Sequence, residues 1–239
     1  FIRPSVLLVS IISLILIQPD LGASAVIFVS ALGVLFIAGV PSKQFIIVFL
    51  IGLIGIILLI TYVPWRWERI ISFVDPWSDP FDKGFQLTLS LMSIGRGDWF
   101  GVGLGQSLMK MGYLPDAHTD FIFSILIEEL GLLAGILIFG MLFGISFRIF
   151  LIGRKSLNNR NHFGFFFCFG AAILIGLHVF INVGVATGLL PTKGLTLPLF
   201  SAGGTNILVT CSMIGLILRI DYENKISMPI ASIKRRVNF

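Results

Sequence analysis

Charged residues are scarce in this 239-residue sequence, so those beside long apolar runs are the first candidates for chemistry. Only 12% of the residues are Asp, Glu, Lys or Arg. Asp120 ends the polar run that begins at Tyr113, and it opens a long apolar stretch. A charge at the mouth of such a stretch is costly to keep there, which marks a functional site by default. We interpret Asp120 as the candidate catalytic carboxylate, a base for an attacking hydroxyl; a helix N-cap is the alternative role.

Polar residues on both sides of Asp120 are candidates for contact with a substrate. His118 and Thr119 come directly before it. For His118 a structural hydrogen bond is favoured over direct chemistry, because residues so close together on a helix do not face each other well. In one continuous helix Glu128 lies about 80° around the axis from Asp120, so we expect it to line the same cavity. Glu129 points to the opposite side and is expected to meet another helix.

Cationic side chains supply the second half of the candidate site. Lys193 lies in the segment Leu190–Pro198, between two apolar runs. Its expected roles are binding an anionic head group or pairing with a carboxylate. Thr192 adjoins it, and Arg66 and Arg69 add positive charge near the same face. We expect all four residues to contact substrate.

Small and polar residues, among them Ser201, Gly203 and Gly204, precede the last apolar run. They leave the backbone accessible and could cradle a phosphate, while close helix packing explains the same residues equally well. The sequence has no zinc-ligand spacing and no serine-hydrolase constellation, so we assign no metal ligand. Cys168 and Cys211 lie within apolar runs and are expected to be buried.

The composition places these residues in a membrane protein. Hydrophobic residues make up 56% of the chain and the mean hydropathy is +0.99, against roughly 45–50% apolar residues in soluble domains. Helices satisfy every backbone group in lipid, so we predict an all-α polytopic membrane protein, with residues 1–239 forming a single membrane domain. The six expected transmembrane spans are about Pro4–Gln18, Leu21–Val40, Gln44–Val63, Phe121–Ile152, Phe163–Leu190 and Leu197–Leu218.

The distribution of Lys and Arg predicts the orientation. Alternating spans divide the loops into two sets, and the set richer in basic residues is cytoplasmic by the positive-inside rule. The C-terminus is then cytoplasmic, and residues 64–119 form a long extracytoplasmic loop. Within that loop, Phe85–Ile94 is expected to be a short surface or re-entrant helix, and the tryptophans favour an interfacial aromatic belt over stacking on a substrate. The net charge of +5 reflects topology and contact with anionic membrane lipid, not nucleic-acid binding.

Five runs of residues resemble the SEDS family of bacterial membrane proteins. They occur in the family's order, cover nearly the whole chain and are more like its division branch than its elongation branch. The resemblance implies a fold of ten transmembrane helices, of which this chain would supply helices five to ten. Its start at Phe, without a Met, fits the C-terminal part of a longer protein. The runs are Gln18–Gly22, Gly101–Ser107, Tyr113–Phe123, Glu128–Gly131 and Gly188–Pro198.

The resemblance also implies an activity. SEDS proteins are peptidoglycan glycosyltransferases that polymerise lipid II, a disaccharide peptide linked to a polyprenyl diphosphate. Their partner is a class B penicillin-binding protein that acts as the transpeptidase, and the division branch works with other divisome proteins in the inner membrane at the septum. The family's catalytic aspartate matches Asp120, and its functional outer-loop lysine matches Lys193. No organic cofactor is implied, and a requirement for a divalent cation is left open.

The sequence departs from the family pattern at two places. The family usually has Glu where this chain has Asp116, and Ser-Tyr-Gly-Gly-Ser-Ser where residues 201–206 read Ser-Ala-Gly-Gly-Thr-Asn. The second change loses an aromatic hydroxyl.

A lipid II flippase would need polar residues throughout its spans, whereas here they concentrate in the outer half. A scaffold that only positions the penicillin-binding protein would have no need of Asp120.

Overall fold

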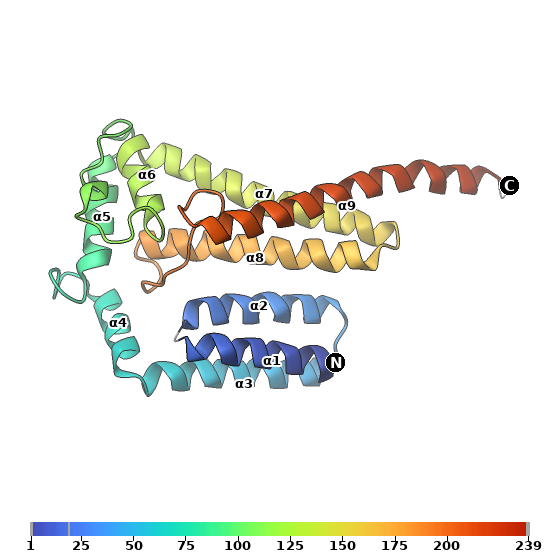
Figure 1. Cartoon of the computed structure of the whole chain (residues 1–239), viewed down its shortest axis with the longest axis horizontal. Helices are drawn as coiled ribbons and strands as arrows, with labels where there is room; N and C mark the ends of the chain where they lie inside the picture. Colours follow the sequence, from blue (N-terminus) through green and yellow to red (C-terminus); the bar gives the residue numbers. More distant parts are fainter. Residues whose placement is uncertain (1, 19, 238–239) are drawn as a thin grey trace.

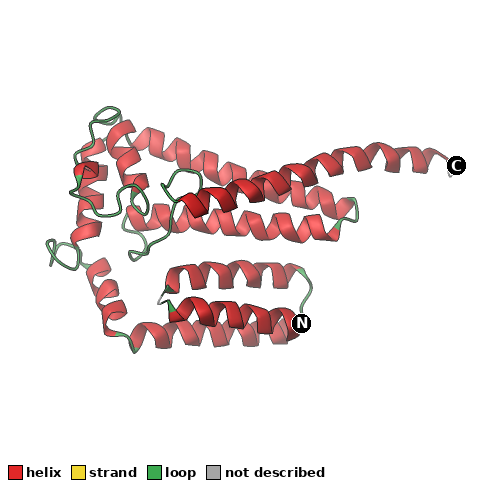
Figure 2. Ribbon diagram, in the orientation of Figure 1, coloured by secondary structure: helices red, strands yellow, loops and turns green. Residues whose placement is uncertain are grey.

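The computed structural model describes residues 2–18 and 20–237, and every regular element within them is helical (Figure 2). The elements are α1 (Ile2–Ile17), α2 (Leu21–Ile37), α3 (Ser42–Thr61), α4 (Pro64–Val74), α5 (Phe85–Gly97), the 3₁₀ turn η1 (Met109–Met111), α6 (Ile122–Leu130), α7 (Leu132–Asn158), α8 (His162–Ala186) and α9 (Gly204–Val237). α3, α7, α8 and the first part of α9 are long and apolar enough to cross a membrane, and α1 and α2 are apolar but shorter. The prediction of an all-α polytopic membrane protein is confirmed.

The helices form two groups that are joined at one end (Figure 1). α1, α2 and α3 make one group, α7, α8 and α9 make the other, and α2 packs against α8 between them. α4 and α5 run across the same end of both groups; we call this the loop end. The main core lies between α7 and α8, around Ile138, Leu142, Cys168 and Val179. Cys168 is buried as predicted, but Cys211 is exposed, so the prediction for Cys211 is wrong.

The fourth predicted span, Phe121–Ile152, is divided at Gly131. α6 lies beside α5 at the loop end, and α7 begins after the glycine and runs along the bundle (Figure 1). Gly131 has a φ of +87°, and a Cβ there would lie 2.3 Å from the carbonyl oxygen of Trp99. A Cβ at Gly101 would likewise lie 2.3 Å from the carbonyl oxygen of Glu129. The two backbone segments can cross this closely because both positions are glycine, and the crossing ends α6.

Local signals set the ends of the other helices that border the loop end. The Asp20 carboxylate accepts a hydrogen bond from the Ala23 backbone N–H at 2.9 Å and so caps α2. α5 confirms the short helix predicted to begin at Phe85 and continues to Gly97. α9 begins at Gly204, later than the predicted sixth span, because the residues before it form a loop that packs against the segment leading to α6.

Candidate active site

Two segments from distant parts of the sequence are held side by side at the loop end. Asn182, a buried residue of α8, donates its amide to the carbonyl oxygens of Asp120 at 2.8 Å and Leu195 at 2.7 Å. The Ser201 hydroxyl donates to the Thr119 carbonyl oxygen and accepts from the Leu197 N–H, both at 2.6 Å. Because each side chain bonds both segments, the α8–α9 loop and the residues before α6 form one unit.

The carboxylate of Asp120 faces the loop between α8 and α9. A Cβ added to Gly194 would lie 3.2 Å from Asp120 Oδ2, so the acid lies against the residue that follows Lys193. The alternative role of Asp120 as an N-cap is not what the structure shows. α6 begins at Ile122, and its N-cap residue Phe121 makes no side-chain capping bond. The Asp120 side chain is therefore available for chemistry.

The surroundings of Asp120 favour a carboxyl group that can take up a proton near neutral pH. Partial burial, then the negative charge of Asp116 and then that of Asp20, raise the pKa of Asp120 to about 6. Burial and like charges both disfavour the ionised form. A general base is most effective when its pKa lies near the working pH, so this environment suits proton abstraction.

Lys193, which precedes the glycine that Asp120 faces, lies among positive charges. Partial burial lowers its pKa, Arg69 and Arg66 lower it further, and Asp20 acts in the opposite direction. The Arg69 guanidinium donates to the Thr192 carbonyl oxygen at 3.5 Å, and Arg66, itself buried, donates to a backbone carbonyl at the end of α3. Positive side chains that lie close enough to repel one another, as Lys193, Arg66 and Arg69 do, are the arrangement expected where an anion binds.

Asp20 belongs to this site, although sequence reasoning did not select it. A Cβ at Gly22 would lie 3.5 Å from Asp20 Oδ1 and 3.6 Å from Lys193 Cδ, so the cap of α2 and the lysine border the same glycine. Asp20 also raises the pKa of both Asp120 and Lys193. The sequence feature that could have identified Asp20 is its position between two apolar spans, in one of the five runs that resemble the family.

A cavity of about 580 Å³ extends from Asp20 between α2, α8 and α9; we call it the α2–α9 cavity. Its walls are mostly aliphatic, with Ile27 of α2, Leu174 of α8 and Val209 of α9 among them. His178 and Asn206 are polar groups in the wall. The charged site thus opens onto an apolar space between helices, which suits a ligand with an anionic head and a hydrocarbon chain.

Glu128 lies in a different cluster, and its predicted place beside Asp120 is wrong. It is fully buried and accepts hydrogen bonds from Arg96 at 2.6 Å, Ser93 at 3.0 Å, Ser107 at 2.5 Å and a backbone N–H. The helical angle used for the prediction does not apply, because α6 begins only after Asp120. Glu128 instead ties α6 to α5 and to the loop that leads to the active site.

The remaining candidate substrate-binding residues lie where the α8–α9 loop meets the segment before α6. Ser201 is fully buried and holds the loop through its two hydrogen bonds. The His118 carbonyl oxygen accepts from the Ala202 N–H, and its ring is exposed. Gly203 precedes the final helix and Gly204 begins it, close to that contact. In the described residues no group of three or more His, Cys, Asp or Glu side chains is arranged to hold a metal ion.

Residues 1–226 match the model of a protein family, that of FtsW, RodA and SpoVE, described as cell cycle protein. The chain belongs to this family. Two relatives named probable peptidoglycan glycosyltransferase FtsW, from Aliivibrio salmonicida and Wigglesworthia glossinidia brevipalpis, are each 46% identical to it, over 95% and 98% of this chain and 56% and 62% of their own lengths. The chain therefore spans little more than half the length of these curated relatives. The family inferred from the five sequence runs is confirmed.

Solved structures of family members share the fold. A chain from a peptidoglycan synthase complex, described as coordinating polymerization and crosslinking, matches with a TM-score of 0.70 and 29% identity, covering 92% of this chain and 61% of that one. The rod shape determining protein RodA of Thermus thermophilus, as an Asp-to-Ala mutant, matches with a TM-score of 0.58 and 26% identity, covering 94% and 57%.

Proposed function

We propose that the whole protein is a peptidoglycan glycosyltransferase that polymerises lipid II into glycan strands during septal wall synthesis. The observation that carries the proposal is the placement of the Asp120 carboxylate against Gly194, the residue that follows Lys193. A base and a cationic anion-binding group then border one site, as glycosyl transfer from a diphosphate requires. The names of the relatives, probable peptidoglycan glycosyltransferase FtsW, support the same reaction.

In the proposed reaction a sugar hydroxyl of one lipid-linked substrate attacks the anomeric carbon of another. The new C–O bond forms as the bond from that carbon to the diphosphate breaks, and the polyprenyl diphosphate leaves with the electron pair. Asp120 takes the hydroxyl proton. Lys193, with Arg69 and Arg66, stabilises the negative charge that develops on the leaving diphosphate. Thr192, which joins Arg69 to Lys193, helps to position these cations.

The α2–α9 cavity supports a lipid-linked substrate, because an apolar space adjoins the charged site. In the proposed orientation the loop end is extracytoplasmic and the C-terminus is cytoplasmic, since most Lys and Arg residues then lie inside. The protein would lie in the inner membrane at the division septum. A class B penicillin-binding protein, together with other divisome proteins, is the proposed partner; the match to a chain of a peptidoglycan synthase complex supports a partnership of this kind.

Two other functions make different demands on the same residues. A flippase needs a polar path through the membrane, whereas the α2–α9 cavity has mainly aliphatic walls along its length. A scaffold needs no partly buried acid with a raised pKa at the α8–α9 loop. Both observations favour the enzyme, because perturbed titratable groups that converge on one site are typical of catalysis.

The proposal is tested by giving purified lipid II to the full-length protein and its partner in detergent. Glycan synthesis is expected, and movement of labelled lipid II across vesicles without glycan synthesis would support the flippase instead. In cells depleted of the native protein, Asp120→Asn should fail to restore division while accumulating to the normal level. Restoration of division by this variant would support the scaffold.

A further inference from the structure

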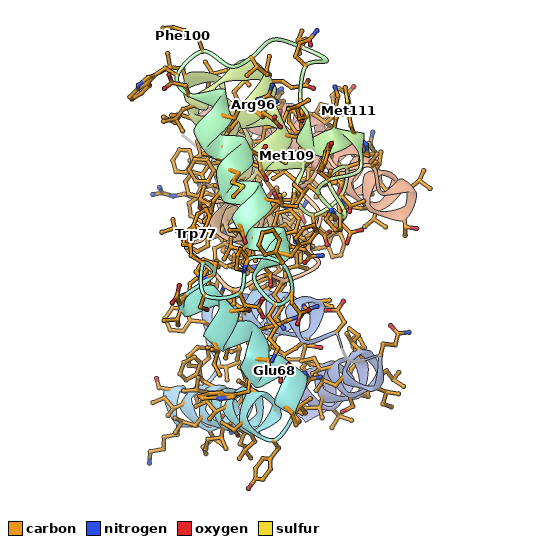
Figure 3. All side chains as sticks on the ribbon, turned by 90° about the vertical axis from the view of Figure 1, so that its left-hand side faces the viewer. Glu68, Trp77, Arg96, Phe100, Met109 and Met111 are labelled. Atoms are coloured by element: carbon orange, nitrogen blue, oxygen red, sulfur yellow. The ribbon has the colours of Figure 1, made fainter. Side chains whose placement is uncertain are left out.

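A second cavity, of about 430 Å³, adjoins the active site between α4, the start of α5 and the α8–α9 loop; we call it the α4–α5 cavity. Figure 3 looks onto this end of the molecule, with Glu68 of α4 below Trp77 and Arg96. Arg69 and Thr192 belong to its wall, and Thr192 directly precedes Lys193. Pro115, next to Asp116, also lines it. The cavity therefore shares a side with the proposed catalytic site.

The α4–α5 cavity differs in chemistry from the α2–α9 cavity. Its wall carries positive and negative side chains, among them Lys83, Glu68 and Asp82, together with the amide of Gln86 and the ring of Phe85. Charged and amide groups bind hydroxyls, carboxylates and ammonium groups, and an aromatic ring covers the apolar face of a sugar. A hydrocarbon chain would leave these polar groups without partners, which disfavours it here.

We infer that the α4–α5 cavity binds the polar sugar–peptide part of the growing glycan strand. The inference rests on the proposed function. A strand that grows at Asp120 must extend away from the charged site, and the structure offers a polar cavity there that is separate from the apolar one. A polymer of amino sugars that carries peptides with carboxylate and ammonium groups matches the polar cavity. Its occupation would keep the strand bound between successive additions.

The test is the length of the glycan made by the full-length protein after Asp82→Asn combined with Gln86→Ala. Asp75→Asn is the matched control, because Asp75 lies in the same connection between α4 and α5 but does not line the cavity. We expect mean glycan length to fall roughly two- to tenfold, as one or two lost hydrogen bonds would weaken retention, while the first coupling of two lipid II molecules keeps its rate. Unchanged length, or an equal loss in the first coupling, would overturn the inference.

A charge exchange separates ligand binding from a structural role. Lys83 and Glu68 form an ion pair of 3.1 Å with both side chains about half exposed, so the pair adds little stability. In Glu68→Lys with Lys83→Glu the pair is kept but the charges presented to the strand are reversed. Shortened glycan is expected from this variant. Glycan of wild-type length would show that only the pair matters, whereas a wild-type protein that makes no glycan would defeat the proposed function itself.

Discussion

The carboxylate of Asp120 lies against Gly194, the residue that follows Lys193, although the two segments are far apart in the sequence. Asn182 and Ser201 hold them together through hydrogen bonds to backbone carbonyls of the Asp120 segment. The segment that carries Asp120 and the segment that carries Lys193 are thereby fixed side by side. This relationship is the physical basis of the proposed reaction.

Gly194→Ala should reduce turnover while leaving the fold intact. The new Cβ would lie 3.2 Å from Asp120 Oδ2, so the carboxylate must shift by a few tenths of an ångström or more. Small displacements of a catalytic group are costly, and we expect a loss on the order of 10-fold in initial rate. Gly95→Ala is the control, because nothing lies near its Cβ position. Equal rates for the two variants would show that the position of the carboxylate is not critical.

The initial rate of glycan synthesis should fall as the pH drops through about 6, the value to which the pKa of Asp120 is raised. The base form is lost below that pH, so activity has an acid limb there. Asp116→Asn removes one of the charges that raise the pKa, and the limb should move to lower pH. A pH–rate profile with an unmoved acid limb in this variant would contradict the assignment of the limb to Asp120.

We expect an alkaline limb of the pH–rate profile where Lys193 loses its proton, in addition to the acid limb set by Asp120. Asp20→Asn should move both limbs to lower pH. Asp20 raises the pKa of Asp120 and also that of Lys193, whereas Asp116 is a cause only for Asp120. Asn caps a helix about as well as Asp, so α2 should keep its start and the thermal stability should change little. A profile that moves only on its acid side, or not at all, would place Asp20 outside the site.

Glu128→Gln should destabilise the protein more than Glu129→Gln. Glu128 is fully buried with four donors around one carboxylate, including Arg96 at 2.6 Å. Breaking a fully buried pair costs about 3–5 kcal/mol, and we expect about 2–4 kcal/mol here because Arg96 is partly exposed. Glu129 pairs with Lys110 in a more accessible place, so Glu129→Gln should lower the free energy of unfolding by only about 1 kcal/mol. Thermal unfolding in one detergent compares the two, and similar midpoints would contradict a special role for Glu128.

The sequence predicted the elements better than it predicted which side chains meet. Long apolar runs and scarce charge are enough to predict membrane helices, and the capping chemistry of Asp20 fits its place between two of them. Asp120 was selected because a charge is costly at the mouth of an apolar span, and Lys193 because a basic residue on the outer side opposes the positive-inside rule. Their proximity depends on Asn182 and Ser201, whose bonds link segments that no local pattern connects.

The fourth predicted span was wrong at two places, each with its own physical cause. An apolar run was read as one helix through Gly131, but a non-local crossing with Gly101 interrupts it. Neither glycine is distinguished in its own local sequence, so the crossing of the two segments could not be predicted from either one. At the other end of the span, α6 begins only at Ile122, so Asp120 lies outside the helix and the helical angle from it to Glu128 does not apply. Glu128 instead bonds to Arg96 of α5.

The most direct test of the account is the initial rate of lipid II polymerisation by Asp120→Asn and Asp116→Asn at pH 7.5. Each variant removes one carboxylate from the same short segment, but only the carboxylate of Asp120 is placed against Gly194. Asp120→Asn should be folded and at least as stable as wild type, since burial disfavours the ionised acid. We expect its rate to fall by about 10²-fold or more, with Asp116→Asn staying within a few-fold of wild type. Near-normal polymer from Asp120→Asn would contradict the account.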